Sequence, residues 1–118
     1  MSAAIQNLLD QAVRFPGLLA AGVFAENQRL VSRNQEAAMT EVELGKVWRH
    51  LSDAMDVSQH HRMPAAQMRW IFERVLVYCV KRNDGLLLGL IFSRESAPQL
   101  SQEGLETLFN EFRKLRDA

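Results

Sequence analysis

Three short segments of this chain carry apolar side chains at almost every position, and they constrain the fold more than any other feature. They are residues 18–25 (LLAAGVFA), 75–81 (VLVYCVK) and 86–92 (LLLGLIF). A strand points alternate side chains to opposite faces, so a strand without a polar face belongs inside a sheet that is covered on both sides. Alternation within the first segment predicts one face with Leu19, Ala21 and Val23 and another with Leu18, Ala20 and Phe24.

Two further segments read as strands of mixed character, which is typical of the edges of a sheet. One is Leu30–Asn34, which follows the polar turn 26–29 (ENQR). The other is Gln67–Glu73, which alternates. One face of this second segment carries Met68, Trp70 and Phe72, and the other carries Arg69, Ile71 and Glu73.

Three helices complete the pattern. The first has apolar residues at helical spacing from Ile5 to Val13 and ends at Phe15-Pro16-Gly17, because proline disfavours helix before it. The second opens with the capping pair Thr40 and Glu43 and has the apolar stripe Leu44, Val47, Trp48, Leu51 and Met55. The third follows Ser101 and has the stripe Leu105, Leu108, Phe109, Phe112 and Leu115. Residues 58–66 and 93–99 are expected to be loops.

These elements predict an α+β fold of order α-β-β-α-β-β-β-α, in effect an α/β sandwich. The sequence Asn83-Asp84-Gly85 is a strong hairpin signal, because Asp-Gly adopts the positive φ angles of tight turns. If hairpins join neighbouring strands and the three apolar strands are central, the antiparallel sheet has the order 2-1-5-4-3. Helices are then expected on both faces. We expect a single domain covering residues 1–118.

Composition excludes several classes of protein. Lys and Arg number 14 and Asp and Glu 14, so the net charge is zero and no basic excess points to nucleic acid. No apolar run approaches the roughly 20 residues of a spanning helix, and the N-terminus does not resemble a signal peptide. The single cysteine permits no internal disulfide. We expect a cytoplasmic protein without membrane insertion.

Candidate catalytic and metal-binding residues are few. Cys79 lies in a dense apolar strand and is expected to be a buried, inert thiol. His60 and His61 are expected to be a solvated loop pair rather than metal ligands, and His50 to be structural or exposed. We expect no catalytic residue, metal or cofactor, and therefore a protein that is not an enzyme.

The order of elements resembles the Roadblock family, named for a dynein light chain and including bacterial regulators of small GTPases. Three stretches carry the resemblance: FPGLLAAGVFAENQRLVSRN, the long helix from Thr40, and RWIFERVLVYCVKRNDGLLLGLIFSRES. The resemblance covers nearly the whole chain. It implies a non-enzymatic scaffold that binds a small Ras-like GTPase or a motor-associated complex and modulates its nucleotide state.

The resemblance also implies a homodimer in which the third strand pairs with its twin and the second helices lie side by side. The candidate interface residues are Trp48, Leu51, Met55, Met68, Trp70 and Phe72. For Trp48 and Trp70, ordinary packing within the chain is the alternative interpretation. The alternative for the whole protein is a profilin-like or Per-Arnt-Sim-type sensor, which would hold a small ligand in a cavity lined by the central strands.

Overall fold

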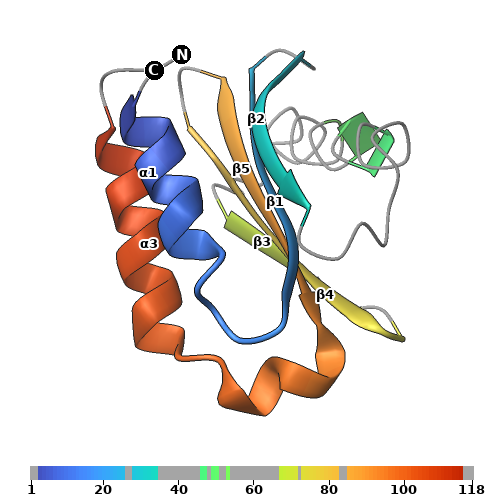
Figure 1. The fold of residues 1–118 in the computed structure, drawn as a ribbon. Coiled ribbons are helices and arrows are strands. Elements are labelled where there is room, and N and C mark those ends of the chain that lie inside the picture. Colours follow the sequence, from blue (N-terminus) through green and yellow to red (C-terminus); the bar gives the residue numbers. More distant parts are fainter. Residues whose placement is uncertain are drawn as a thin grey trace.

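A computed structural model of the chain describes residues 3–25, 28–34, 46–47, 49–50, 53, 67–71, 73–82 and 85–115. Strands and helices lie in separate layers, as in an α+β protein (Figure 1). The strands are β1 (Leu18–Ala25), β2 (Gln28–Asn34), β3 (Gln67–Ile71), β4 (Val75–Lys81) and β5 (Leu86–Ser93). The helices are α1 (Ala3–Ala12), the 3-10 helix η1 (Arg94–Gln99) and α3 (Gln102–Lys114). No helix among these residues is long and apolar enough to cross a membrane.

The strands form one sheet of order β2-β1-β5-β4-β3, in which all neighbours are antiparallel. This is the order that the apolar patterns predict. Hairpins make neighbours of β1 and β2, of β3 and β4, and of β4 and β5, and the pairing of β5 with β1 joins the two halves. Every residue of β5 from Leu86 to Phe92 is buried, as expected of a central strand.

A β-bulge in β1 changes which face its side chains occupy. Leu18 pairs with Phe92 and Ala20 pairs with Ile91, so Leu19 is an extra residue in the register. Leu19 therefore lies on the same face as Ala20, and Leu18 lies on the opposite face. The prediction that simple alternation would place Leu19 with Ala21 was wrong, because a bulge reverses the alternation on one side of itself.

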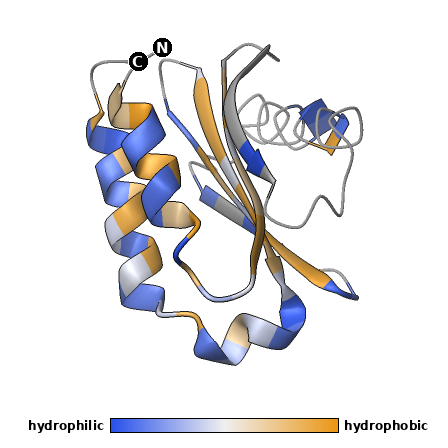
Figure 2. Ribbon diagram, in the orientation of Figure 1, coloured by the Kyte–Doolittle hydropathy of each residue, from blue (hydrophilic) through white to orange (hydrophobic). Residues whose placement is uncertain are grey.

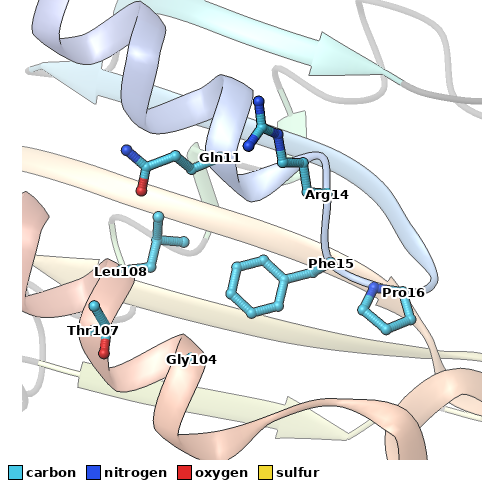
Figure 3. Close-up of a pocket in the computed structure, with 7 residues that line it drawn as sticks. All are labelled: Gln11, Arg14, Phe15, Pro16, Gly104, Thr107 and Leu108. Atoms are coloured by element: carbon cyan, nitrogen blue, oxygen red, sulfur yellow. The ribbon is translucent and has the colours of Figure 1, made fainter.

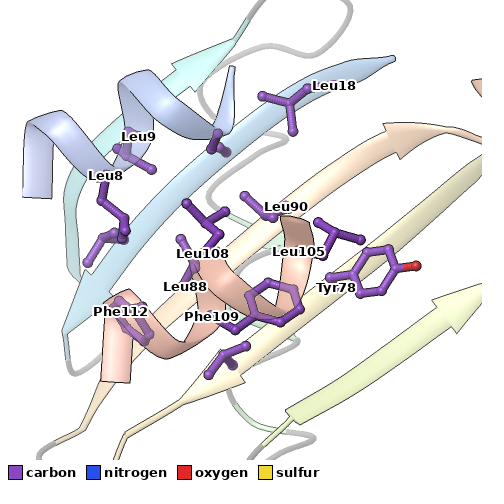
Figure 4. Close-up of a cluster of buried hydrophobic side chains, with 14 of the residues drawn as sticks. Leu8, Leu9, Leu18, Tyr78, Leu88, Leu90, Leu105, Leu108, Phe109 and Phe112 are labelled. Carbon is purple, nitrogen blue, oxygen red and sulfur yellow. The ribbon is translucent and has the colours of Figure 1, made fainter. Parts of the chain in front are cut away.

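One face of the sheet is covered by α1 and α3, which lie side by side (Figure 1). Figure 2 shows that both helices have a hydrophobic and a hydrophilic side. The predicted stripes are buried against the sheet: Ile5, Leu8, Leu9 and Ala12 of α1, and Leu105, Leu108, Phe109 and Phe112 of α3. They meet alternate residues of the central strands, of which Tyr78, Leu88 and Leu90 are labelled in Figure 4. Tyr78 contacts Phe92 edge to face, with ring centroids 5.7 Å apart.

The other face carries a smaller apolar cluster of Ala20, Phe24, Val77, Cys79, Leu87 and Ile91. Val47 packs against this cluster. In the sequence around Val47, the described residues 46–47, 49–50 and 53 are helical, in agreement with the helix predicted from Thr40. Thr40, Glu43 and most of that segment lie outside the described residues. The prediction that a helix covers this face is therefore confirmed at one residue, Val47.

Small residues occupy the middle of this second face. Gly22 pairs with Gly89 across β1 and β5, and Gly89 pairs with Cys79 across β5 and β4. Two of these three residues have no side chain and the third has a small one, so little side-chain volume stands above the backbone here. Glycine in a strand often marks a place where another segment can approach the backbone closely.

The corner after α1 forms as the Phe-Pro-Gly sequence predicts, and it is locked by η1. Gly17 has φ = 75°, which favours glycine, and its carbonyl accepts a hydrogen bond from the Ser93 amide at 2.8 Å. A Cβ built on Gly17 would lie 2.3 Å from the Ser96 Cβ. The expectation of an irregular loop at 93–99 was wrong, because residues 94–99 form a 3-10 helix.

The β4–β5 and β1–β2 turns differ in how closely the sequence predicts them. Gly85 has φ = 92° in the β4–β5 turn, and the Arg82 amide donates to the Leu86 carbonyl at 2.8 Å, so the predicted hairpin is confirmed at Gly85, whereas Asn83 and Asp84 lie outside the described residues. The predicted turn at 26–29 is too long, because Gln28 pairs with Ala25 and belongs to β2. The strand predicted to run to Glu73 ends as β3 at Ile71.

Candidate functional site: the outer strand and the helix layer

Strand β3 forms one edge of the sheet. It pairs with β4 in the register Gln67↔Val80 to Ile71↔Leu76, and no described strand pairs with its outer side. A strand edge offers a row of amide and carbonyl groups to another extended chain. The outer side of β3 is therefore a candidate surface for association with another strand.

One face of β3 is polar at its start and apolar at its end. Gln67, Arg69 and Ile71 are all exposed. Ile71 is 56% exposed, and among the residues whose side-chain exposure the structure describes it is the one large hydrophobic residue that is exposed. Its register partner on β4, Leu76, is only 6% exposed. Ile71 thus extends the apolar surface of the sheet outwards, to the open edge.

The start of β3 is tied to α3 by a chain of polar side chains. The Gln67 Nε2 donates to the Glu106 Oε1 at 3.2 Å, and the Arg113 guanidinium donates to the Gln67 Oε1. Arg113 also donates to the Asn110 Oδ1 at 2.9 Å. These bonds are exposed, so each stabilises little, but together they fix where the outer strand lies relative to the helix.

The predicted interface residues fall into two groups. Met68 and Trp70 lie in β3, opposite Cys79 and Val77 of β4 in the register. Both of these β4 residues belong to the apolar cluster on the second face. Trp48, Leu51, Met55 and Phe72 lie outside the described residues. The proximity of the two groups therefore remains a prediction.

The predicted chemistry of Cys79 agrees with its surroundings. The residue is buried, and burial raises the pKa of its thiol from 9.0 to about 12, although the nearby Lys81 acts in the opposite direction. The thiol stays protonated near neutral pH and is a poor nucleophile. His50 is helical and exposed, whereas His60 and His61 lie outside the described residues. Among the residues that the structure describes, no three His, Cys, Asp or Glu side chains gather in a potential metal site.

A groove between α1 and α3 is a feature that the sequence analysis missed. It has a volume of about 280 Å³ and is lined by Gln11, Arg14, Phe15, Pro16, Gly104, Thr107 and Leu108 (Figure 3). Gly104 is the only hint of it in the sequence, because glycine within a helix is destabilising relative to alanine and calls for a local reason. Here a Cβ on Gly104 would lie 3.3 Å from the Phe15 ring.

A second hollow, at the end of β5, has balanced charge. It is lined by Glu73, Arg74, Ser93, Arg94 and Glu95, and the Arg94 amide donates to the Arg74 carbonyl at 2.9 Å. Two carboxylates and two guanidinium groups leave no net attraction for an ion of either sign.

Neither hollow resembles the cavity expected of a ligand sensor. That cavity would be lined by the central strands, where Leu88, Leu90 and Phe92 are instead fully buried against the helices. Of the residues lining the two hollows, only Ser93, the last residue of β5, comes from a central strand. The packed layer between α1, α3 and the sheet disfavours a sensor whose ligand lies on this face.

Comparisons with known proteins connect this fold to a group of solved structures. No family model and no curated protein sequence matches the chain. Among solved structures, the chain is similar to an MglB structure with a tetrameric arrangement, at a TM-score of 0.71 and 12% identity, covering 97% of this chain and 88% of that one. MglB from Myxococcus xanthus matches at a TM-score of 0.68 and 14% identity, covering 95% and 90%. A Roadblock/LC7 domain from Streptomyces avermitilis matches at 0.61 and 14% identity, covering 89% and 90%.

Proposed function

We propose that this chain, which has the Roadblock fold, is a non-enzymatic scaffold that self-associates and regulates a small Ras-like GTPase in the cytoplasm. One observation carries the proposal: the chain shares its fold with MglB structures over nearly its whole length, and the open edge of its sheet is strand β3, on which Ile71 is exposed. One of the similar MglB structures has a tetrameric arrangement, which supports self-association within this fold.

Self-association is proposed to occur through β3 and the helix predicted from Thr40. Two copies of β3 paired edge to edge would extend the two sheets into one and would cover the exposed Ile71. The zero net charge leaves little repulsion between copies.

The oligomeric state tests this surface directly. We expect light scattering after size exclusion to give a dimer or a higher species for the wild type and a smaller species for Ile71→Lys and Trp70→Glu. The matched control is Asn7→Lys, which places a charge on an exposed position of α1 and should not change the mass. A wild-type monomer at micromolar concentration, or a control that dissociates as readily as the two β3 variants, would refute the proposed surface.

Regulation of a GTPase is the second part of the proposal. We expect calorimetry to detect binding to a Ras-like GTPase of the same genome, with different affinities for its GDP form and its form bound to a non-hydrolysable GTP analogue. The rate of phosphate release or of nucleotide exchange should change when this protein is added. If every such GTPase leaves the chain unbound in both nucleotide states, this part fails, whatever the oligomeric state.

A further inference from the structure

The groove between α1 and α3 has an apolar floor and polar lips. The floor is formed by the half-buried Phe15 ring and the buried Leu108, and Gly104 of α3 lies beside the ring (Figure 3). The lips are exposed: Arg14 on the α1 side and Thr107 on the α3 side. Such a groove offers an apolar contact flanked by groups that bind polar atoms.

Its size suits one anchoring side chain rather than a whole small molecule. The volume of about 280 Å³ is just below the range of roughly 300–1,000 Å³ that is usual for small-molecule pockets. A protruding aliphatic side chain on a partner chain can occupy it, while the partner's backbone runs across the exposed lips.

The charge at the lip is positive, because the exposed Arg14 lies there. Among the described residues, the Arg14 guanidinium makes no ion pair. Asp10 lies one helical turn earlier and could have paired with it, but its carboxylate lies 3.5 Å from the Arg33 guanidinium instead. Gln6 also holds Arg33, accepting a hydrogen bond at 2.9 Å. The pairing of β2 with α1 through Arg33 thus leaves Arg14 available to another carboxylate.

The groove lies near the N-terminus of α3, where Glu103 and the Ser101 cap already meet the positive end of the helix. Gly104 and Thr107 belong to the first two turns of α3, near the positive end of the helix dipole. Ser101 caps this end by accepting a hydrogen bond from the Gly104 amide at 3.0 Å.

From this geometry we propose that the groove is a docking site for a peptide segment of a partner protein that presents an aliphatic side chain beside a carboxylate. The aliphatic group contacts Phe15 and Leu108, and the carboxylate pairs with Arg14. The site lies on the helix layer, whereas the proposed self-association surface lies on β3. It therefore does not depend on the proposed function.

The test uses the full chain labelled with ¹⁵N and a defined pair of peptides. The acidic probe is acetyl-Gly-Asp-Leu-Asp-Gly-amide, and its neutral counterpart has Asn in place of both Asp residues. A single anchor with one ion pair is expected to bind with a Kd on the order of 1 mM, which amide chemical shifts can follow. We expect the acidic probe to shift the amide signals of Gly104 and Thr107.

Two variants and their controls assign the binding to the groove. Arg14→Gln should weaken binding of the acidic probe about fivefold, the upper range for an exposed ion pair, and Lys114→Gln should leave it unchanged. Thr107→Phe should abolish binding by filling the groove, and Asn7→Phe, which adds the same ring elsewhere on α1, should not. Unchanged amide spectra away from each substitution verify the fold.

The proposal is overturned if neither peptide shifts these amides, if the shifts map to another surface, or if the neutral peptide binds as well as the acidic one. It is equally overturned if Arg14→Gln binds the acidic probe like the wild type. Because oligomeric state and GTPase binding are measured separately, failure here is distinguishable from failure of the proposed function.

Discussion

The contact between Gly17 and η1 yields the sharpest prediction. Gly17 has φ = 75°, and a Cβ there would lie 2.3 Å from the Ser96 Cβ and 2.4 Å from its Oγ. Gly85 has φ = 92°, but a Cβ there would have no atom within 4 Å. Alanine at either site incurs the strain of a left-handed backbone, whereas only Gly17→Ala must also displace η1.

The expected magnitudes differ accordingly. Backbone strain alone destabilises by about 1–2 kcal/mol, which is the expected effect of Gly85→Ala. Overpacking adds about 1–3 kcal/mol, so Gly17→Ala should destabilise by about 2–5 kcal/mol. At roughly 4 °C per kcal/mol for a chain of this size, the two variants should melt several degrees apart.

Urea unfolding of the two variants, followed by circular dichroism, measures the difference. A double-mutant cycle identifies its cause, because Ser96→Gly removes both atoms with which the new Cβ would clash and leaves only the Ser93 Cβ at 3.7 Å. In the Ser96→Gly background, Gly17→Ala should destabilise no more than Gly85→Ala does. Equal effects of the two alanine substitutions in the wild-type background, or no relief from Ser96→Gly, would refute the steric argument.

Three further predictions concern the core and the helix ends. Phe112→Ala should destabilise by about 3–5 kcal/mol in urea unfolding, because the ring is fully buried, whereas the exposed Lys114→Ala should change stability by less than about 0.5 kcal/mol. Ser101→Ala removes the cap on the Gly104 amide and should destabilise by about 1 kcal/mol, whereas Ser101→Asp should retain the cap; equal melting temperatures would contradict this. The pKa of the Cys79 thiol is about 12 in the folded protein, against 9.0 ordinarily. Its contribution to stability is therefore complete below pH 9. Above pH 9 the thiol ionises in the unfolded state first, so the free energy of unfolding should fall by about 1.4 kcal/mol per pH unit towards pH 12. Cys79→Ala should show a shallower decline over that range, and parallel curves would exclude this contribution.

The sheet order could be predicted because it depends on which strands have a polar face. The segments 18–25, 75–81 and 86–92 have none, so each must have a strand on both sides and cover above and below. The polar residues of β2 and β3 place those strands at the edges. The end of α1 at the Phe-Pro-Gly corner, the Asp-Gly hairpin and the cap at Ser101 follow from equally local chemistry.

The bulge at Leu19 and the helix η1 have no such local signal. Leu19 becomes an extra residue only because β1 must match β5, a strand nearly 70 residues away, in register. η1 packs against Gly17, so its shape depends on a corner that is distant in sequence.

Some features of the candidate site are likewise local in the sequence, whereas others depend on tertiary packing. The sequence by itself determined that β3 is an edge with an apolar component, since alternation along one strand is a local property. Only the tertiary structure decided that Ile71 is exposed on it, that Gln67 is tied to α3, and that Arg14 and Gly104 border one groove. The physical reason is that a strand's two faces are set by its backbone, whereas a groove between two helices exists only once packing brings together segments about 90 residues apart.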